Sequence, residues 1–122
     1  MASPNKAAQE VLGYNHDQVA TFRKALNDLA DSAQRDSDRW FPDTSRDLGH
    51  IALALGGEVG EMQNIIKKIE RGTKTLDEAR GDLRDELADV FVYFLDVCSL
   101  VGSDILYDYF TKQTYNNERF TK

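Results

Sequence analysis

The stretch LGHIALALGGEVGEMQNIIKK, Leu48 to Lys68, decides the fold. Its apolar residues recur at steps of three and four, which is the spacing of one face of an α-helix. The same pattern extends from Asp47 to Glu70 without a proline. We therefore expect a long amphipathic helix that ends near Gly72. The three glycines within residues 56–60 are unexpected, because each costs a helix about 1 kcal/mol relative to alanine.

Two further apolar stripes predict helices. The first runs from His16 to about Ala33, and Asn15 precedes it as a natural N-cap. The second runs from Leu83 to Val101 and ends at Gly102. No alternating strand pattern competes with these stripes. The predicted fold class is all-α.

The segments between the stripes predict the connections. Residues 1–14 read as a flexible arm, and residues 35–47, RDSDRWFPDTSRD, read as a connection broken by proline. Thr75 and Glu78 have the spacing of a capping box that opens a short helix. Gly81 predicts a joint before the next helix, and Ser103 can cap a last one. We expect one domain at residues 15–122, an antiparallel four-helix-type bundle that a second chain can complete.

Composition and charge exclude several classes of partner and of metal site. The chain has 122 residues and 41% hydrophobic residues, enough for one core. Its formal net charge of -6 disfavours nucleic-acid polymers and anionic membranes as partners. The single cysteine, Cys98, has no second thiol for a disulfide or a zinc cluster. No leader and no membrane-spanning segment is evident, so a cytoplasmic protein is the expectation.

Two pairs of acids suggest a metal site. Glu58 and Glu61 are three residues apart at the edge of one apolar stripe, and Glu86 and Asp89 repeat this spacing on another. If the two stripes pack together, four carboxylates converge and need a neutralising charge. Oxygen ligands alone suit Mg²⁺, or Mn²⁺ as a second possibility. The glycines around Glu58 would let a backbone or a ligand come close.

Other interpretations of the acids exist. Acids three residues apart are common on the solvated faces of helices, and the chain would then be a non-catalytic helical interaction module. A di-iron carboxylate bundle is set aside, because its Glu-x-x-His motif is absent after both Glu58 and Glu86.

The pattern as a whole resembles a known family. Glu58-x-x-Glu61 followed by Glu86-x-x-Asp89 is similar to the E-x-x-E…E-x-x-D signature of the MazG-like all-α nucleoside triphosphate pyrophosphohydrolases. Residues 48–68, with their trailing lysines, and ELADVFVYFLDV resemble the two motif helices of that family, and KQTYNNERF resembles its final element. The resemblance covers about residues 19 to 120.

The resemblance implies a function and a set of site residues. The implied reaction is metal-dependent hydrolysis of a ribo- or deoxynucleoside triphosphate to the monophosphate and pyrophosphate. The alternative is a phosphoribosyl-ATP pyrophosphohydrolase-like activity. The implied metal ligands are Glu58, Glu61, Glu86 and Asp89, and Glu61 is also our choice of general base. The implied phosphate-binding residues are Lys68, Lys112 and Arg119, and the implied substrate-binding residues are Trp40, His50, Tyr93 and Asn116.

Two details refine this implication. DRWFP resembles the aromatic entry of the dCTP pyrophosphatase branch, whereas His50 stands where that branch usually has asparagine and is more similar to short phage and bacterial MazG-like proteins. A homodimer or homotetramer is expected, because the aromatic last helix and the long stripes carry more apolar surface than one chain hides.

Overall fold

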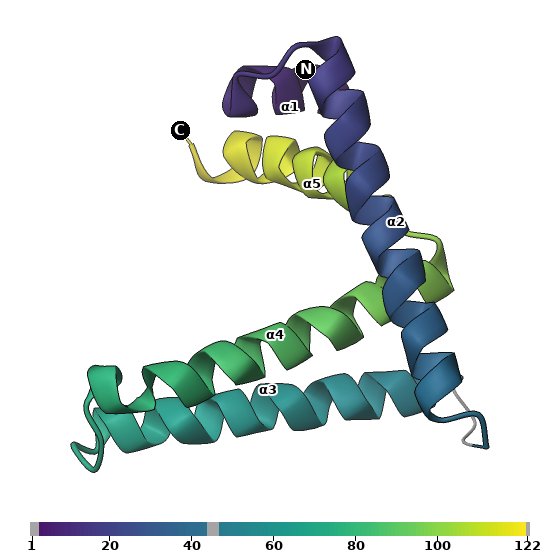
Figure 1. The fold of residues 1–122 in the computed structure, drawn as a ribbon. Coiled ribbons are helices and arrows are strands. Elements are labelled where there is room, and N and C mark those ends of the chain that lie inside the picture. The colour runs from purple at the N-terminus through teal and green to yellow at the C-terminus, as the bar shows by residue number, and fades with distance from the viewer. Residues whose placement is uncertain (1–2, 44–46, 122) are drawn as a thin grey trace.

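The computed structural model describes residues 3–43 and 47–121, and every regular element within these ranges is a helix (Figure 1). The prediction of an all-α fold is confirmed for this part of the chain. The helices are α1 (Pro4–Leu12), α2 (His16–Trp40), α3 (Leu48–Glu70), α4 (Leu76–Val101) and α5 (Ile105–Phe120).

The N-terminal segment is a helix and not the flexible arm that the sequence predicts. Ser3 caps α1 by accepting a hydrogen bond from the Lys6 amide, and Gly13 ends it with a φ of 69°. Ala8 is almost fully buried against α2 and α5. A helix of nine residues has a weak periodic signal and is stabilised mainly by its packing, which explains the error.

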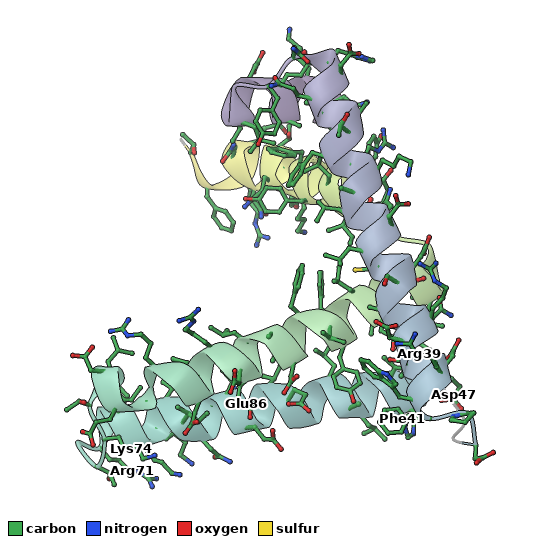
Figure 2. All side chains as sticks on the ribbon, viewed as in Figure 1. Arg39, Phe41, Asp47, Arg71, Lys74 and Glu86 are labelled. Carbon is green, nitrogen blue, oxygen red and sulfur yellow. The ribbon has the colours of Figure 1, made fainter. Side chains whose placement is uncertain are left out.

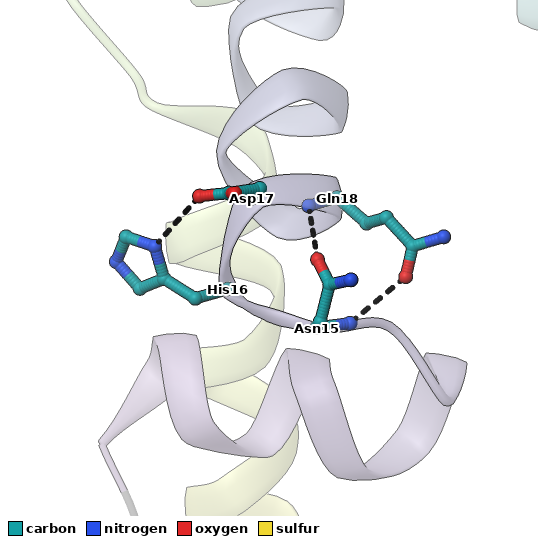
Figure 3. Close-up of polar contacts among 4 residues, drawn as sticks. All are labelled: Asn15, His16, Asp17 and Gln18. Carbon is teal, nitrogen blue, oxygen red and sulfur yellow. Dashed lines mark hydrogen bonds and ion pairs between the residues drawn. The ribbon is translucent and has the colours of Figure 1, made fainter.

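Helix α2 begins as predicted. The Gln18 amide donates to Asn15 Oδ1 at 2.9 Å, while the Asn15 amide donates to Gln18 Oε1 at 2.9 Å (Figure 3). This reciprocal capping box satisfies two amides that the first turn leaves without partners. His16 lies exposed at the start of the helix, 3.5 Å from Asp17.

The end of α2 differs from the prediction. The helix continues through residues 35–40, which the sequence assigns to a connection, and ends at Trp40. Arg39 pairs with Asp36 at 2.9 Å within these last turns, and Ser37 is buried. Polar residues can continue a helix when such i, i+3 pairs support it, so loss of the apolar stripe does not mark the end of a helix.

Helices α3 and α4 form an antiparallel hairpin (Figure 1). The predicted start of α3 is confirmed, because Asp47 accepts a hydrogen bond of 2.8 Å from the His50 amide. The predicted capping box is also confirmed: Thr75 and Glu78 exchange side-chain-to-amide hydrogen bonds at the start of α4. The predicted joint at Gly81 is wrong, since α4 is continuous there.

The connection between α4 and α5 is only partly as predicted. Gly102 ends α4 with a φ of 70°, as predicted. The residue at the N-cap position of α5 is Asp104 and not Ser103, whose hydroxyl instead donates to Asp108 Oδ2 at 2.6 Å. Asp104 is held by Arg23 of α2, which fixes α5 against that helix.

The helices pack around α2 at two separate places. Near the start of α2, a small core joins it to α1 and α5 through Ala8, Val19, Leu106 and Phe110. Farther along, Ala30 and Ala33 pack against Leu95 and Cys98 of α4. The α3–α4 hairpin therefore projects from one end of α2, while α1 and α5 lie at the other end (Figure 1).

No single helix in the described part of the chain is long and apolar enough to cross a bilayer. Helices α4 and α5 reach the required length and apolarity only when they are counted together across a bend of 94°.

Candidate metal centre

Three carboxylates converge midway along the α3–α4 hairpin. Glu58 of α3 and Glu86 and Asp89 of α4 each offer an oxygen, and these oxygens all lie within 4.8 Å of one another. Figure 2 shows Glu86 midway along the hairpin, far from the turn that carries Arg71 and Lys74. The three-residue spacings on two antiparallel helices thus produce the cluster that the sequence predicts for these three residues.

Two of these carboxylates are partly withdrawn from water. Glu58 and Glu86 are half-buried, whereas Asp89 is exposed. Glu58 Oε2 and Glu86 Oε2 are buried and have no hydrogen-bond partner among the described residues. A buried carboxylate oxygen without a donor is costly, so each of these atoms needs a proton or a cation nearby.

The pKa values of Glu58 and Glu86 are both raised in this cluster. Burial, helped by the neighbouring carboxyls of Glu58 and Glu61, raises the pKa of Glu86 to about 7. Burial is also the main cause that raises the pKa of Glu58, and the charges of Glu61 and Asp89 raise it further, while the hydrogen bond that a protonated Glu86 carboxyl donates to Glu58 opposes the change. The cluster is therefore short of positive charge near neutral pH.

Glu61 approaches the carboxyl groups of Glu58 and Glu86 but is not in the group of three whose oxygens all lie within 4.8 Å of one another. Its side chain is exposed, and its oxygens are not among those that group within 4.8 Å. It is close enough to repel the charges of Glu58 and Glu86. Its exposed carboxylate can contact water or a ligand next to a bound ion.

The geometry and the donor set fit a divalent cation. Two oxygens on opposite sides of Mg²⁺ are about 4.2 Å apart, because each bond is about 2.1 Å long. The observed limit of 4.8 Å requires only small side-chain rotations to reach this spacing. The residues also satisfy the chemistry, since carboxylate oxygens alone favour Mg²⁺ or Mn²⁺ over metals that prefer histidine or cysteine.

The glycines of α3 have no packing role within the described chain. A methyl group added at Gly56, Gly57 or Gly60 would meet no atom within 4 Å. The expectation that they admit a neighbouring backbone is therefore not met by any described segment of the same chain. Gly57 lies on the side of α3 that carries Glu61, where it leaves the approach to the acids open.

The other predicted site residues on the hairpin are less closely grouped. His50, Glu61 and Lys68 lie along one edge of α3, and all three are exposed. Lys68 follows Glu61 by seven residues, which is about 10 Å along the helix on nearly the same side. Tyr93 is half-buried on α4, one turn after Asp89. Trp40, with 58% of its surface exposed, lies at the end of α2.

The predicted residues of α5 gather elsewhere. Lys112 and Asn116 line a pocket of about 380 Å³ with Phe94, Tyr109 and Gln113. The Lys112 ammonium also lies 5.0 Å from the centre of the Tyr115 ring, and the Arg119 guanidinium lies 4.9 Å from that of Phe120. Because α5 packs on α1 and α2, these cations are not brought to the acidic cluster within one chain.

Asp96 is a buried acid that the sequence analysis overlooks. Only 1% of its surface is exposed, and it lies two turns beyond Asp89 on α4. Its signal was the interruption of the apolar run VFVYFLDVCSLV by an acid. A charge inside such a run is rarely buried without a partner, so the interruption predicts a polar contact in the core.

The chain was also compared with known proteins. No family model matches it, and no match was found among curated proteins or among solved structures.

Proposed function

We propose that the chain is a metal-dependent pyrophosphohydrolase acting on nucleoside triphosphates. The observation that supports this most directly is the convergence of Glu58, Glu86 and Asp89, with two buried oxygens that have no donor among the described residues. Such a cluster suits one or more hard cations, which also bind the oxygens of a triphosphate. The resemblance of the motifs supports the same substrate class.

Each acid has a definite part in this proposal. Glu58, Glu86 and Asp89 would hold Mg²⁺ or Mn²⁺; when bound, the cation neutralises the phosphates and lowers the pKa of a coordinated water. Glu61, exposed beside the cluster, would accept the proton of the attacking water. Its carboxylate is exposed to water and lies next to Glu58 and Glu86, which supports this role.

The cations and polar groups would orient the substrate. Lys68 lies along the edge of α3 that carries Glu61, so its ammonium would bind phosphate oxygens that extend from the centre. His50 and Tyr93 flank the same region and offer hydrogen-bond donors. Lys112, Asn116 and Arg119 lie on α5, so their proposed contacts with the substrate require a ligand or a second chain that brings α5 to the hairpin.

The proposal is tested by assaying pyrophosphate release from a panel of ribo- and deoxynucleoside triphosphates and from phosphoribosyl-ATP, with Mg²⁺ or Mn²⁺. We expect release from at least one nucleoside triphosphate and a loss of about 10²-fold or more in the rate for Glu61→Gln. Glu70→Gln, an exposed acid at the end of α3, is the matched control and should keep full activity.

Two results would redirect the proposal. Release from phosphoribosyl-ATP alone would move the activity to the alternative substrate class. No release from any substrate with either metal would leave a helical interaction module.

A further inference from the structure

The turn between α3 and α4 carries positive charge in an otherwise acidic chain. Residues 67–74 contain four cations and one acid, which gives this segment a formal charge of +3. Because the whole chain carries -6, the other 114 residues together carry -9. We call the four cations the basic cluster; they are Lys67, Lys68, Arg71 and Lys74. Figure 2 shows Arg71 and Lys74 at the turn, which is the end of the hairpin farthest from α2.

The four side chains of the basic cluster start from neighbouring positions. Arg71 follows Lys67 by four residues and Lys68 by three, and residues at these spacings are neighbours on the surface of a helix. The Lys74 amide donates a hydrogen bond of 3.3 Å to the Lys68 carbonyl, which brings the fourth cation to the same place. Like charges at these spacings destabilise a helix. The basic cluster therefore opposes stability, as groups kept for binding often do.

No ion pair within the described part of the chain neutralises the basic cluster. The nearby acids at the start of α4 have other partners: Asp77 pairs with Arg80 at 2.7 Å, and Glu78 accepts a hydrogen bond of 3.1 Å from the Thr75 amide. The hydrogen bonds with Thr75 are also the main cause that lowers the pKa of Glu78, and the charge of Lys74 adds only a smaller part. Three of the four cations are exposed, and Lys74 is half-buried.

The end of α3 does not need these side chains to complete its hydrogen bonds. Cations are common at this end of a helix because its dipole attracts them. Here, however, the backbone amides of residues 71–74 already donate to the carbonyl oxygens of residues 67–69. Gly72, with a φ of 76°, lets the backbone close in this way. The four cationic groups thus extend from a turn that its own backbone fixes, and they can contact a ligand.

The surroundings of the basic cluster disfavour nucleic acid as that ligand. The sequence has no aromatic residue between Phe41 and Phe91, so the turn offers no ring on which an unpaired base can stack. A long duplex would extend beyond the turn along a chain whose other residues carry -9, and this charge would repel its phosphates.

The spacing of the cations favours condensed phosphate over an acidic peptide. On one face of a peptide helix or strand, successive carboxylates start about 5 to 7 Å apart, so few of them can meet the basic cluster at once. A chain of condensed phosphates carries a negative charge on every phosphate. Its oxygens suit both cation types, because the Arg71 guanidinium binds two phosphate oxygens as a fork and each lysine binds one as a point charge.

We propose that the basic cluster is a binding site for inorganic polyphosphate, the linear polymer of condensed phosphate. Arg71 would lie at the centre of the contact, with the three lysines around it. The site is separate from the metal centre, since Arg71 follows Glu58 by thirteen residues, which is about 20 Å along α3. Lys68 is the residue that this proposal shares with the proposed enzymatic site. The proposal does not depend on the enzymatic activity, because it rests on charge, spacing and backbone hydrogen bonds.

Fluorescence anisotropy of an end-labelled inorganic polyphosphate, titrated with the full chain, tests the proposal. EDTA is present throughout, so that phosphate cannot bind through a metal ion at the acidic cluster. For the wild type, the logarithm of the binding constant should fall by about 3 for a tenfold rise in salt, because four phosphate contacts release counterions. Arg71→Gln combined with Lys74→Gln should reduce this fall to about 1.5 and weaken binding at low salt at least about tenfold.

The matched control removes two exposed cations from other helices. Lys6→Gln combined with Arg35→Gln changes the net charge by the same amount and should keep the affinity and the salt dependence of the wild type. Equal weakening in both double variants would show that net charge governs binding, and no binding by the wild type at low salt would also overturn the proposal. Displacement of the label by an oligonucleotide or a polyglutamate peptide, at the same concentration of charge as unlabelled polyphosphate, would reject the choice of ligand.

A measurement on the wild type covers the case in which the double variant fails to fold. Lysines are acetylated with and without inorganic polyphosphate, again in EDTA, and the rates are read by mass spectrometry. Polyphosphate should slow the acetylation of Lys67 and Lys74 several-fold and leave that of Lys6 on α1 unchanged. Equal effects at all three lysines would contradict the proposal.

Discussion

Glu58 of α3 and Glu86 of α4 face each other across the hairpin, and each buries a carboxylate oxygen that has no hydrogen-bond partner among the described residues. Neither residue is at the outer surface of its helix, so their charges cannot be fully solvated. The hairpin thus keeps two acids at a place where packing alone would favour apolar side chains. Such a conflict between stability and residue type is expected at a functional site.

The first prediction concerns pH and stability in the absence of divalent ions. The pKa of Glu86 is raised to about 7 in the folded chain, above its value near 4.5 in the unfolded chain. Between these values the folded state holds the proton more tightly, so the contribution of Glu86 to stability is present at pH 4 and is lost as the pH rises through 7. Thermal unfolding in EDTA should show this decline in the wild type, whereas Glu86→Gln should show a weaker one.

The comparison with Glu86→Gln is needed because other groups titrate as well. Arg23, through a hydrogen bond and its charge, lowers the pKa of Asp104, which contributes stability that is lost as the pH falls. Identical pH profiles for the wild type and Glu86→Gln would show that Glu86 is not the group responsible.

The second prediction concerns metal binding. At a concentration one hundred times its dissociation constant, Mg²⁺ or Mn²⁺ should raise the free energy of unfolding by about 2.7 kcal/mol. The effect should grow as the pH rises through about 7, because the ion binds the ionised form of Glu86. Thermal shift titrations measure it. Glu58→Gln should abolish most of the shift, and Glu70→Gln should leave it unchanged; equal shifts in both would place the ion elsewhere.

The third prediction uses two glycines with the same open surroundings. Gly81 and Gly60 both lie inside helices, and an added methyl group meets no atom within 4 Å at either position. Gly81→Ala should therefore stabilise the chain by about 0.5 to 1 kcal/mol in chemical denaturation. Gly60→Ala should stabilise the chain by a similar amount, because its methyl group has the same open surroundings. A loss of stability in Gly60→Ala alone would mean that something packs at Gly60.

The fourth prediction concerns the attachment of α5. Arg23 and Asp104 form a partly buried ion pair with an oxygen–nitrogen distance of 2.5 Å. Asp104→Asn should destabilise the chain by about 1 to 2 kcal/mol, because the guanidinium keeps its position but loses a charged acceptor. A double-mutant cycle with Arg23→Met, followed by urea unfolding, measures the coupling between the two side chains. A coupling energy near zero would show that the ion pair does not contribute to the free energy of unfolding.

Much of the local structure could be predicted because its causes are local. The caps formed by Asn15 and Thr75 depend on residues three positions apart, and the sequence displays those residues directly. The pairing of Glu58 with Glu86 could also be predicted, because each borders the apolar stripe through which its helix was expected to pack.

The two errors have different physical origins. Helix α1 was missed because Ala8 is stabilised by α2 and α5, and these contacts leave no trace in a nine-residue pattern. The Gly81 joint was wrong because a single exposed glycine lowers helix stability without ending the helix. Contacts outside the local window decided the first outcome, whereas the second follows from local helix propensity.

The sequence by itself determined the helices, their caps and the spacing of the acids, since these follow from hydrogen bonds and side-chain periodicity within a few residues. Only the tertiary structure decided that Glu58, Glu86 and Asp89 form the closest group of carboxyl oxygens, that Lys112 and Asn116 lie in a separate pocket, and that Leu87, Phe91 and Phe94 of the hairpin stay exposed. These relationships depend on the rotation of each helix about its own axis and on where it packs against α2. Burial against residues distant in the sequence sets both.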